Sequence, residues 1–218
     1  IVLADFGFRN SIFDQGFLYC YKVDGTLVWK SNVRVDFNNF NYRQITGKIG
    51  FADFNMDGIP EVYINNKIFN ARTGKLLAHG GANGLGQLRT LIFYEGTISI
   101  ASQLDEDDSD IELAAGYTIY KVLITNLNDT LGNQMIPYNI IVDNEFRDGF
   151  TSVGDLNRDG NLEVVVSHCQ YNGGSILYAY RLVNGIARLL AKTYPTIIGF
   201  TPLFLPGICE LRSGNPSV

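Results

Sequence analysis

Short apolar runs alternate with polar turns along the chain, and this pattern predicts β-strands. After Glu163 the runs are VVVSHC, SILYAYRL and ARLLAKTY, separated by QYNGG and VNGI. The start of the chain follows the same plan with IVLADF, GFLYCYKV and LVWKSN. No stretch of helical length keeps the i, i+3, i+4, i+7 spacing of apolar residues that an amphipathic helix needs. We therefore predict an all-β fold.

Two segments of the chain repeat one another. Residues 52–64 read ADFNMDGIPEVYI and residues 154–166 read GDLNRDGNLEVVV, so Glu61 and Glu163 are 102 residues apart in the shared motif D-x-N-x-D-G-x-x-E-V. Glu112, in SQLDEDDSDIELAAG, lies 51 residues from each. One apolar strand precedes each loop and three follow it. Four strands in about 50 residues are typical of one β-propeller blade.

The repeat divides the chain into units. We place them at residues 1–33 (partial), 48–80, 98–142, 150–194 and 198–218 (partial), all within one β-propeller domain or part of one. The last unit has Glu210 near the repeat position but lacks the acidic residues. The chain holds only about four repeats, which predicts a small ring of about five blades or, as we favour, a portion of a larger seven- or eight-bladed propeller.

The two complete loops present oxygen ligands at alternate positions, as calcium sites do. Calcium prefers six to eight hard oxygen ligands, and glycine after the third ligand permits a sharp turn. In the first loop the predicted ligands are the side chains of Asp53, Asn55, Asp57 and Glu61 and the carbonyl of Ile59. In the third loop they are the side chains of Asp155, Asn157, Asp159 and Glu163 and the carbonyl of Asn161. We predict one Ca²⁺ ion in each.

The middle loop allows two alignments. In strict 51-residue register Leu104 stands at the first ligand position, and Asp108 and Glu112 stay in place. A shift of one residue instead offers a different set of carboxylates, namely Asp105 and Asp107 followed by Asp110 or Glu112. A third calcium site depends on these acids.

Two other interpretations apply to these loops. An EF-hand also begins D-x-N-x-D-G, but it needs a bidentate glutamate at position 12 and flanking helices. Position 12 is Ile64 in the first loop and Val166 in the third, and both lie in strand-like runs, which excludes an EF-hand. Solvated hairpin turns also use Asp, Asn and Gly. Two copies in register, each leading directly into an apolar strand, favour metal binding.

The chain resembles the FG-GAP/VCBS repeat family, which includes the N-terminal propellers of integrin α chains. The resemblance rests on D-x-N-x-D-G-x-x-E-V at residues 53–62 and 155–164 and, more loosely, on QLDEDDSDIELAAG, and it spans most of the chain. It implies a multi-bladed propeller with calcium in the loop that joins the first two strands of a blade. It also implies an extracellular or cell-surface location and a role in adhesion or in binding a protein or carbohydrate.

Charge and composition argue against some classes of binding partner. The net charge is -5 and no Lys/Arg cluster occurs, which argues against nucleic acid as a partner. No apolar stretch approaches the roughly 20 residues that cross a bilayer, so we expect no membrane insertion. The three cysteines (Cys20, Cys169 and Cys209) are either free thiols or one disulfide and a leftover thiol. Asn128-Asp129-Thr130 fits the N-glycosylation sequon.

Catalytic motifs do not emerge from the sequence. His79 and His168 have no partner at zinc-ligand spacing, and GGANGLGQ lacks the lysine of a phosphate-binding loop. We predict no catalytic residue and no organic cofactor. The favoured function is a calcium-binding extracellular propeller that acts as a binding, adhesion or structural module. The alternatives are a lyase-like, polysaccharide-degrading enzyme with structural calcium and a self-assembling subunit of a surface filament or matrix.

Overall fold

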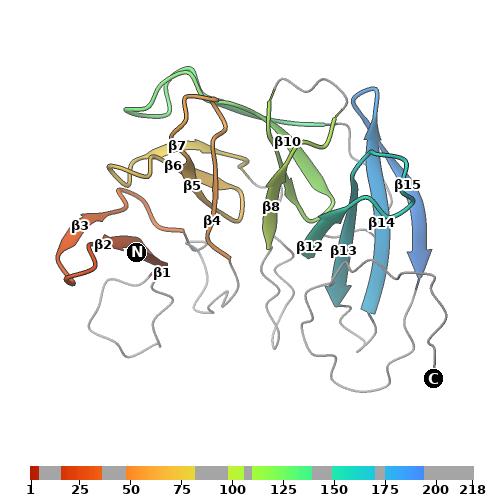
Figure 1. The fold of residues 1–218 in the computed structure, drawn as a ribbon, viewed down its shortest axis with the longest axis horizontal. Helices are drawn as coiled ribbons and strands as arrows, with labels where there is room; N and C mark the ends of the chain where they lie inside the picture. Colours follow the sequence, from red (N-terminus) through yellow and green to blue (C-terminus); the bar gives the residue numbers. More distant parts are fainter. Residues whose placement is uncertain are drawn as a thin grey trace.

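The computed structural model describes residues 1–4, 16–35, 48–81, 98–105, 110–138, 149–169 and 175–193. These residues form fifteen strands in four antiparallel sheets and no helix (Figure 1). The all-β prediction is thereby confirmed. Accordingly, this part of the chain holds no helix with the length and hydrophobicity needed to cross a bilayer.

Each sheet consists of strands that follow one another along the chain. The first has three strands, β1 (Val2–Ala4), β2 (Leu18–Tyr21) and β3 (Leu27–Lys30). The second has β4 (Gly50–Ala52), β5 (Glu61–Ile64), β6 (Lys67–Phe69) and β7 (Leu76–His79). The third has β8 (Ser99–Ser102), β9 (Glu112–Ala115), β10 (Thr118–Leu123) and β11 (Gln134–Pro137). The fourth has β12 (Phe150–Gly154), β13 (Glu163–Cys169), β14 (Ser175–Val183) and β15 (Ile186–Thr193). The predicted unit 198–218 lies outside the described residues.

Two-residue turns explain why consecutive strands pair. Asn65-Asn66 joins β5 to β6, Gly116-Tyr117 joins β9 to β10, and Asn184-Gly185 joins β14 to β15. The first residue of each turn has a positive φ, of 53°, 67° and 51° respectively. Left-handed backbone at this place matches the twist of a tight hairpin, and glycine and asparagine tolerate it best.

Hydrophobic clusters join each sheet to the next. Trp29, Val62 and Phe69 lie in the cluster between the first and second sheets, and Ile68, Leu113 and Tyr120 in the cluster between the second and third. Between the third and fourth sheets the cluster includes Ile119, Val164 and Tyr178. Every residue of β5 and of β9 is buried, because each of these strands is covered on both faces. The core is therefore a series of layers between sheets.

The first strands of successive sheets are neighbours, β4 beside β8 and β8 beside β12. A parallel bridge joins Ile98, just before β8, to Phe150 at the start of β12. These two strands run in the same direction, so the loops that follow them leave from the same end. Tyrosine hydroxyls add polar links between sheets, since Tyr63 accepts the N–H of Ala101 at 3.1 Å.

Candidate metal centres in three equivalent loops

Each loop closes on a buried glutamate that begins the second strand of its sheet. Glu61, Glu112 and Glu163 are 3%, 0% and 0% exposed. Each lies opposite the last residue of the preceding strand, which is Ala52, Ser102 or Gly154. In each loop the glutamate Oε2 accepts a backbone N–H from the second residue after the end of the preceding strand. The donors are Phe54 at 3.0 Å, Leu104 at 2.7 Å and Leu156 at 2.7 Å. This hydrogen bond joins the start of each loop to its end, a place that we call the loop neck.

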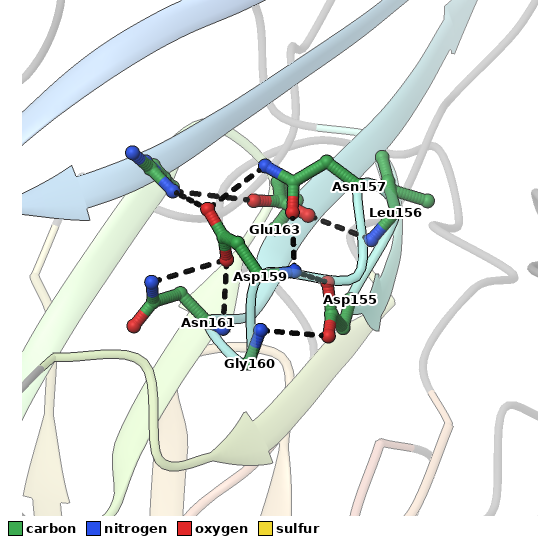
Figure 2. Close-up of polar contacts among 8 residues, drawn as sticks. Asp155, Leu156, Asn157, Asp159, Gly160, Asn161 and Glu163 are labelled. Atoms are coloured by element: carbon green, nitrogen blue, oxygen red, sulfur yellow. Dashed lines mark hydrogen bonds and ion pairs between the residues drawn. The ribbon is translucent and has the colours of Figure 1, made fainter.

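The first and third loops share their internal hydrogen bonds. In the first loop, the two oxygens of Asp53 accept the N–H groups of Asp57 at 3.0 Å and Gly58 at 2.7 Å. In the third loop, shown in Figure 2, Asp155 accepts the N–H groups of Asp159 at 3.1 Å and Gly160 at 3.0 Å. The glycines have φ of 84° and 90°, a region that glycine enters without strain. The repeated sequence thus folds into a repeated loop.

Two carboxylate oxygens of the first loop are left for an external ligand. Asp57 Oδ1 accepts the N–H of Ile59 at 2.8 Å, whereas Oδ2 accepts, among the described residues, only the side-chain amide of Asn55 at 3.1 Å. Glu61 Oε2 accepts the N–H of Phe54 at 3.0 Å, which leaves Oε1 as the second of these oxygens. Asp57 Oδ2 and Glu61 Oε1 are therefore the oxygens that a cation could use most readily.

The middle loop is one residue longer than the other two. Ser102 pairs with Glu112 just as Ala52 pairs with Glu61, but one more residue separates Ser102 from Glu112 than separates Ala52 from Glu61. Counting from the strand end, Gln103 stands at the first ligand position and Asp105 at the third, where the complete loops have asparagine. The strict 51-residue register had instead placed Leu104 first. Asp107 and Asp108 lie outside the described residues.

Three carboxylates converge in this middle loop. Ligand oxygens of Asp105, Asp110 and Glu112 all lie within 4.8 Å of one another, and no other such group occurs among the residues that the structure describes. Glu112 Oε1 is buried and has no hydrogen-bond partner there. Tyr138 donates its hydroxyl to Asp105 at 2.6 Å, and Lys121 Nζ lies 2.9 Å from Asp110. A buried, unbonded oxygen among hard carboxylates fits a hard cation.

When no cation is present, Glu61 and Glu112 keep their protons to a higher pH than an exposed glutamate does. Burial raises the pKa of Glu61 to about 7, and the aspartates of the same loop raise it further, against the N–H of Phe54, which lowers it. Burial likewise raises the pKa of Glu112 to about 7, with the N–H of Leu104 opposing the change. A bound divalent cation would restore the ionised form of both groups.

The third loop contains a basic side chain among its acids. In the antiparallel ladder between β13 and β14, Val164 pairs with Tyr180, so the preceding Glu163 lies opposite the following Arg181. Its Nη1 is 2.6 Å from Asp159 Oδ2 and 3.8 Å from Glu163 Oε1. The hydrogen bond from the Asn161 N–H and this contact with Arg181 hold the pKa of Asp159 at about 2. The acids of this loop are therefore partly neutralised by the protein itself.

Sequence reasoning missed Lys121, Arg181 and Tyr138. A signal existed for Lys121, because the two-residue turn between β9 and β10 places it opposite Glu112, as the ladder shows. Arg181 follows a longer connection, and Tyr138 lies just after the end of β11. Counting residues across a tight turn therefore does not predict that either side chain lies near the acids. Among the other candidates, Cys20 is a free, half-buried thiol and His79 is exposed. Cys209 and the side chains of His168 and Cys169 lie outside the described residues.

No family model, curated protein sequence or solved structure matches the chain. The loops themselves therefore carry the functional evidence.

Proposed function

We propose that this protein is a calcium-stabilised β-propeller segment that acts outside the cell as a binding, adhesion or structural module. The observation that supports it most is the middle loop, where carboxylates of Asp105, Asp110 and Glu112 meet around a buried oxygen without a hydrogen bond. Lys121 offsets one of the charges through Asp110, and Tyr138 donates a hydrogen bond to Asp105, but the buried Glu112 Oε1 has no partner among the described residues. A divalent cation would bind this oxygen and offset the remaining negative charge. In this role calcium holds the fold and takes part in no reaction.

Calcium suits the ligand set better than other common cations. All predicted ligands are carboxylate, amide or carbonyl oxygens, whereas zinc and copper sites usually include histidine or cysteine. Magnesium usually keeps several of its waters and binds one or two carboxylates, whereas each complete loop offers five protein ligands, as calcium sites do. The residues that would hold the ions are Asp53, Asn55, Asp57, Ile59 and Glu61 in the first loop, Asp155, Asn157, Asp159, Asn161 and Glu163 in the third, and Asp105, Asp110 and Glu112 in the middle one.

The sheet order supports a propeller. Three antiparallel sheets of four strands follow one another in chain order, and their first strands adjoin. Such sheets packed face to face are the blades of a propeller when their first strands surround a common axis. An extracellular location agrees with calcium loops, because calcium outside cells is abundant enough to fill weak sites. The partner that we propose is a protein or a carbohydrate, and self-assembly is the alternative.

Thermal unfolding with and without calcium tests the proposal. We expect a chelator to lower the melting temperature by about 5 °C or more for each site that calcium had occupied. Magnesium at the same concentration should restore less of this loss than calcium. The double substitution Asp105→Asn and Asp110→Asn should remove part of the calcium response.

A matched control is Asp24→Asn, which changes an exposed acid in the turn between β2 and β3, away from every loop. It should leave the response to chelator intact. A wild-type melting temperature that is the same in calcium and in chelator would sink the proposal.

A further inference from the structure

The residue opposite the buried glutamate differs between the two complete loops. One step beyond the Val62–Phe69 pair, Asn70 stands opposite Glu61, and one step beyond the Val164–Tyr180 pair, Arg181 stands opposite Glu163. Asn70 is neutral, and its side chain stabilises the turn that follows it. Its Oδ1 accepts the N–H groups of Arg72 and Thr73 at 2.8 and 3.1 Å. The first loop thus receives no charge from this position.

Arg181 contacts the same two oxygens that the first loop leaves free. In the third loop Asp159 Oδ1 accepts the N–H of Asn161 at 2.9 Å, and Glu163 Oε2 accepts the N–H of Leu156 at 2.7 Å. Asp159 Oδ2 and Glu163 Oε1 remain, and Arg181 Nη1 approaches both, at 2.6 and 3.8 Å. In the first loop no ion pair reaches the equivalent oxygens of Asp57 and Glu61 within the described ranges.

A calcium ion and this guanidinium cannot use these oxygens together. Calcium binds oxygen at about 2.3–2.6 Å, so an ion on Asp159 Oδ2 would lie against Arg181 Nη1, and the two positive charges would repel. Arg181 also offsets the charge of Glu163, which is 0% exposed and whose Oε1 accepts no hydrogen bond among the described residues. A buried carboxylate without any positive neighbour is strongly unfavourable.

We propose that Arg181 is a built-in cation that replaces calcium in the third loop. The third loop therefore folds without metal and binds calcium more weakly than the first loop, despite its matching D-x-N-x-D-G-x-x-E sequence. This inference rests on the proposed function, in which the complete loops bind calcium. It makes Arg181 the residue that decides the order in which calcium fills the two loops.

Calcium titration of Arg181→Gln, with calorimetric detection, tests the inference. We expect the third loop to bind calcium at least about tenfold more tightly in R181Q than in the wild type, because one repelling charge is removed. Adding Asp159→Asn to R181Q should abolish this gain, which assigns it to the third loop. In chelator, R181Q should melt at a lower temperature than the wild type, and calcium should restore it.

Two variants serve as controls. Arg181→Lys keeps the charge and should retain the wild-type melting temperature in chelator. Arg188→Gln removes an exposed arginine from β15 that is paired with Arg181 across the sheet. Because like charges directly opposite one another are mildly destabilising, it should not lower the melting temperature in chelator, and it should not reproduce the tenfold gain in calcium affinity of R181Q.

The outcomes separate this inference from the proposed function. If the wild type responds to calcium but R181Q matches it in affinity and in chelator melting, the inference is overturned and the proposed function stands. If neither the wild type nor R181Q binds calcium, the proposed function is overturned and the inference with it. If R181Q is unfolded in chelator, folding on addition of calcium supports the inference, and failure to fold with calcium overturns it.

Discussion

The two complete loops and the middle loop occupy the same place in their sheets, yet they arrange their acids differently. In the complete loops the first aspartate, Asp53 or Asp155, gives both oxygens to N–H groups of its own loop. The middle loop has no aspartate at that position, and instead brings Asp105, Asp110 and Glu112 together. A regular motif therefore specifies a regular backbone, whereas close approach of carboxylates depends on where a longer loop places them.

One feature unites the three loops in spite of this difference. The buried glutamate accepts an N–H from the residue two positions after the preceding strand in each case. This contact holds the loop neck whether or not a cation is present.

The largest effect should follow from removing the shared glutamate. Glu112→Ala leaves the N–H groups of Leu104 and Asp105 without their acceptor, so we expect a loss of about 3 kcal/mol in the free energy of unfolding in saturating calcium. Urea denaturation measures it. Glu61→Ala should cost a similar amount, and a loss confined to E112A would show that the neck bond is not equivalent in the two loops.

Asn55→Asp should make the first loop more like the middle one. Asn55 occupies the ligand position that Asp105 occupies in the middle loop, so the substitution adds one carboxylate to the set. We expect calcium affinity of the first loop to rise about tenfold, which is about 1.4 kcal/mol. Calorimetric titration measures it. The control Asn128→Asp adds the same charge at an exposed turn and should change nothing.

Gly58→Ala tests the backbone of the complete loops. No atom lies within 4 Å of the position that a Cβ would take, so the cost comes from φ of 84° alone. We expect a loss of about 1 kcal/mol in the free energy of unfolding, since alanine is strained in the left-handed region. Gly160→Ala should cost the same, because its φ is 90° and its surroundings are equally open. Unequal losses in urea denaturation would contradict the equivalence of these loops.

The smallest effect is a pH dependence of the metal-free protein. The pKa of Glu61 and of Glu112 is raised from 4.5 to about 7 by burial, so the folded state keeps protons that the unfolded chain releases. Stability should therefore fall as pH rises from 4.5 and level off above about 7, and the part of this loss between about pH 6 and about pH 8 is on the order of 1 kcal/mol per group. Urea denaturation in chelator measures it. A profile that stays unchanged in the double variant E61Q/E112Q would assign the dependence to other groups.

The sequence by itself determined the strands, the repeat and the loop backbone. Apolar alternation, glycine and asparagine turns and the D-x-N-x-D-G spacing are local properties, and local hydrogen bonds enforce them. The apolar strand that the repeat predicts before each loop is present as β4, β8 and β12. Asp53 and Asp155 bond their own loops, as neighbouring residues can do without the rest of the protein.

Only the tertiary structure decided which residues meet at the acids. The pairing of Ser102 with Glu112 places Gln103 at the first ligand position and Asp105 at the third, and so decides between the two alignments that the sequence left open. Arg181 reaches Asp159 because β14 lies beside β13, and Tyr138 reaches Asp105 from beyond the end of β11. These contacts depend on strand register and on chain segments that are distant in sequence, which is why residues with the same motif differ in their charge environment.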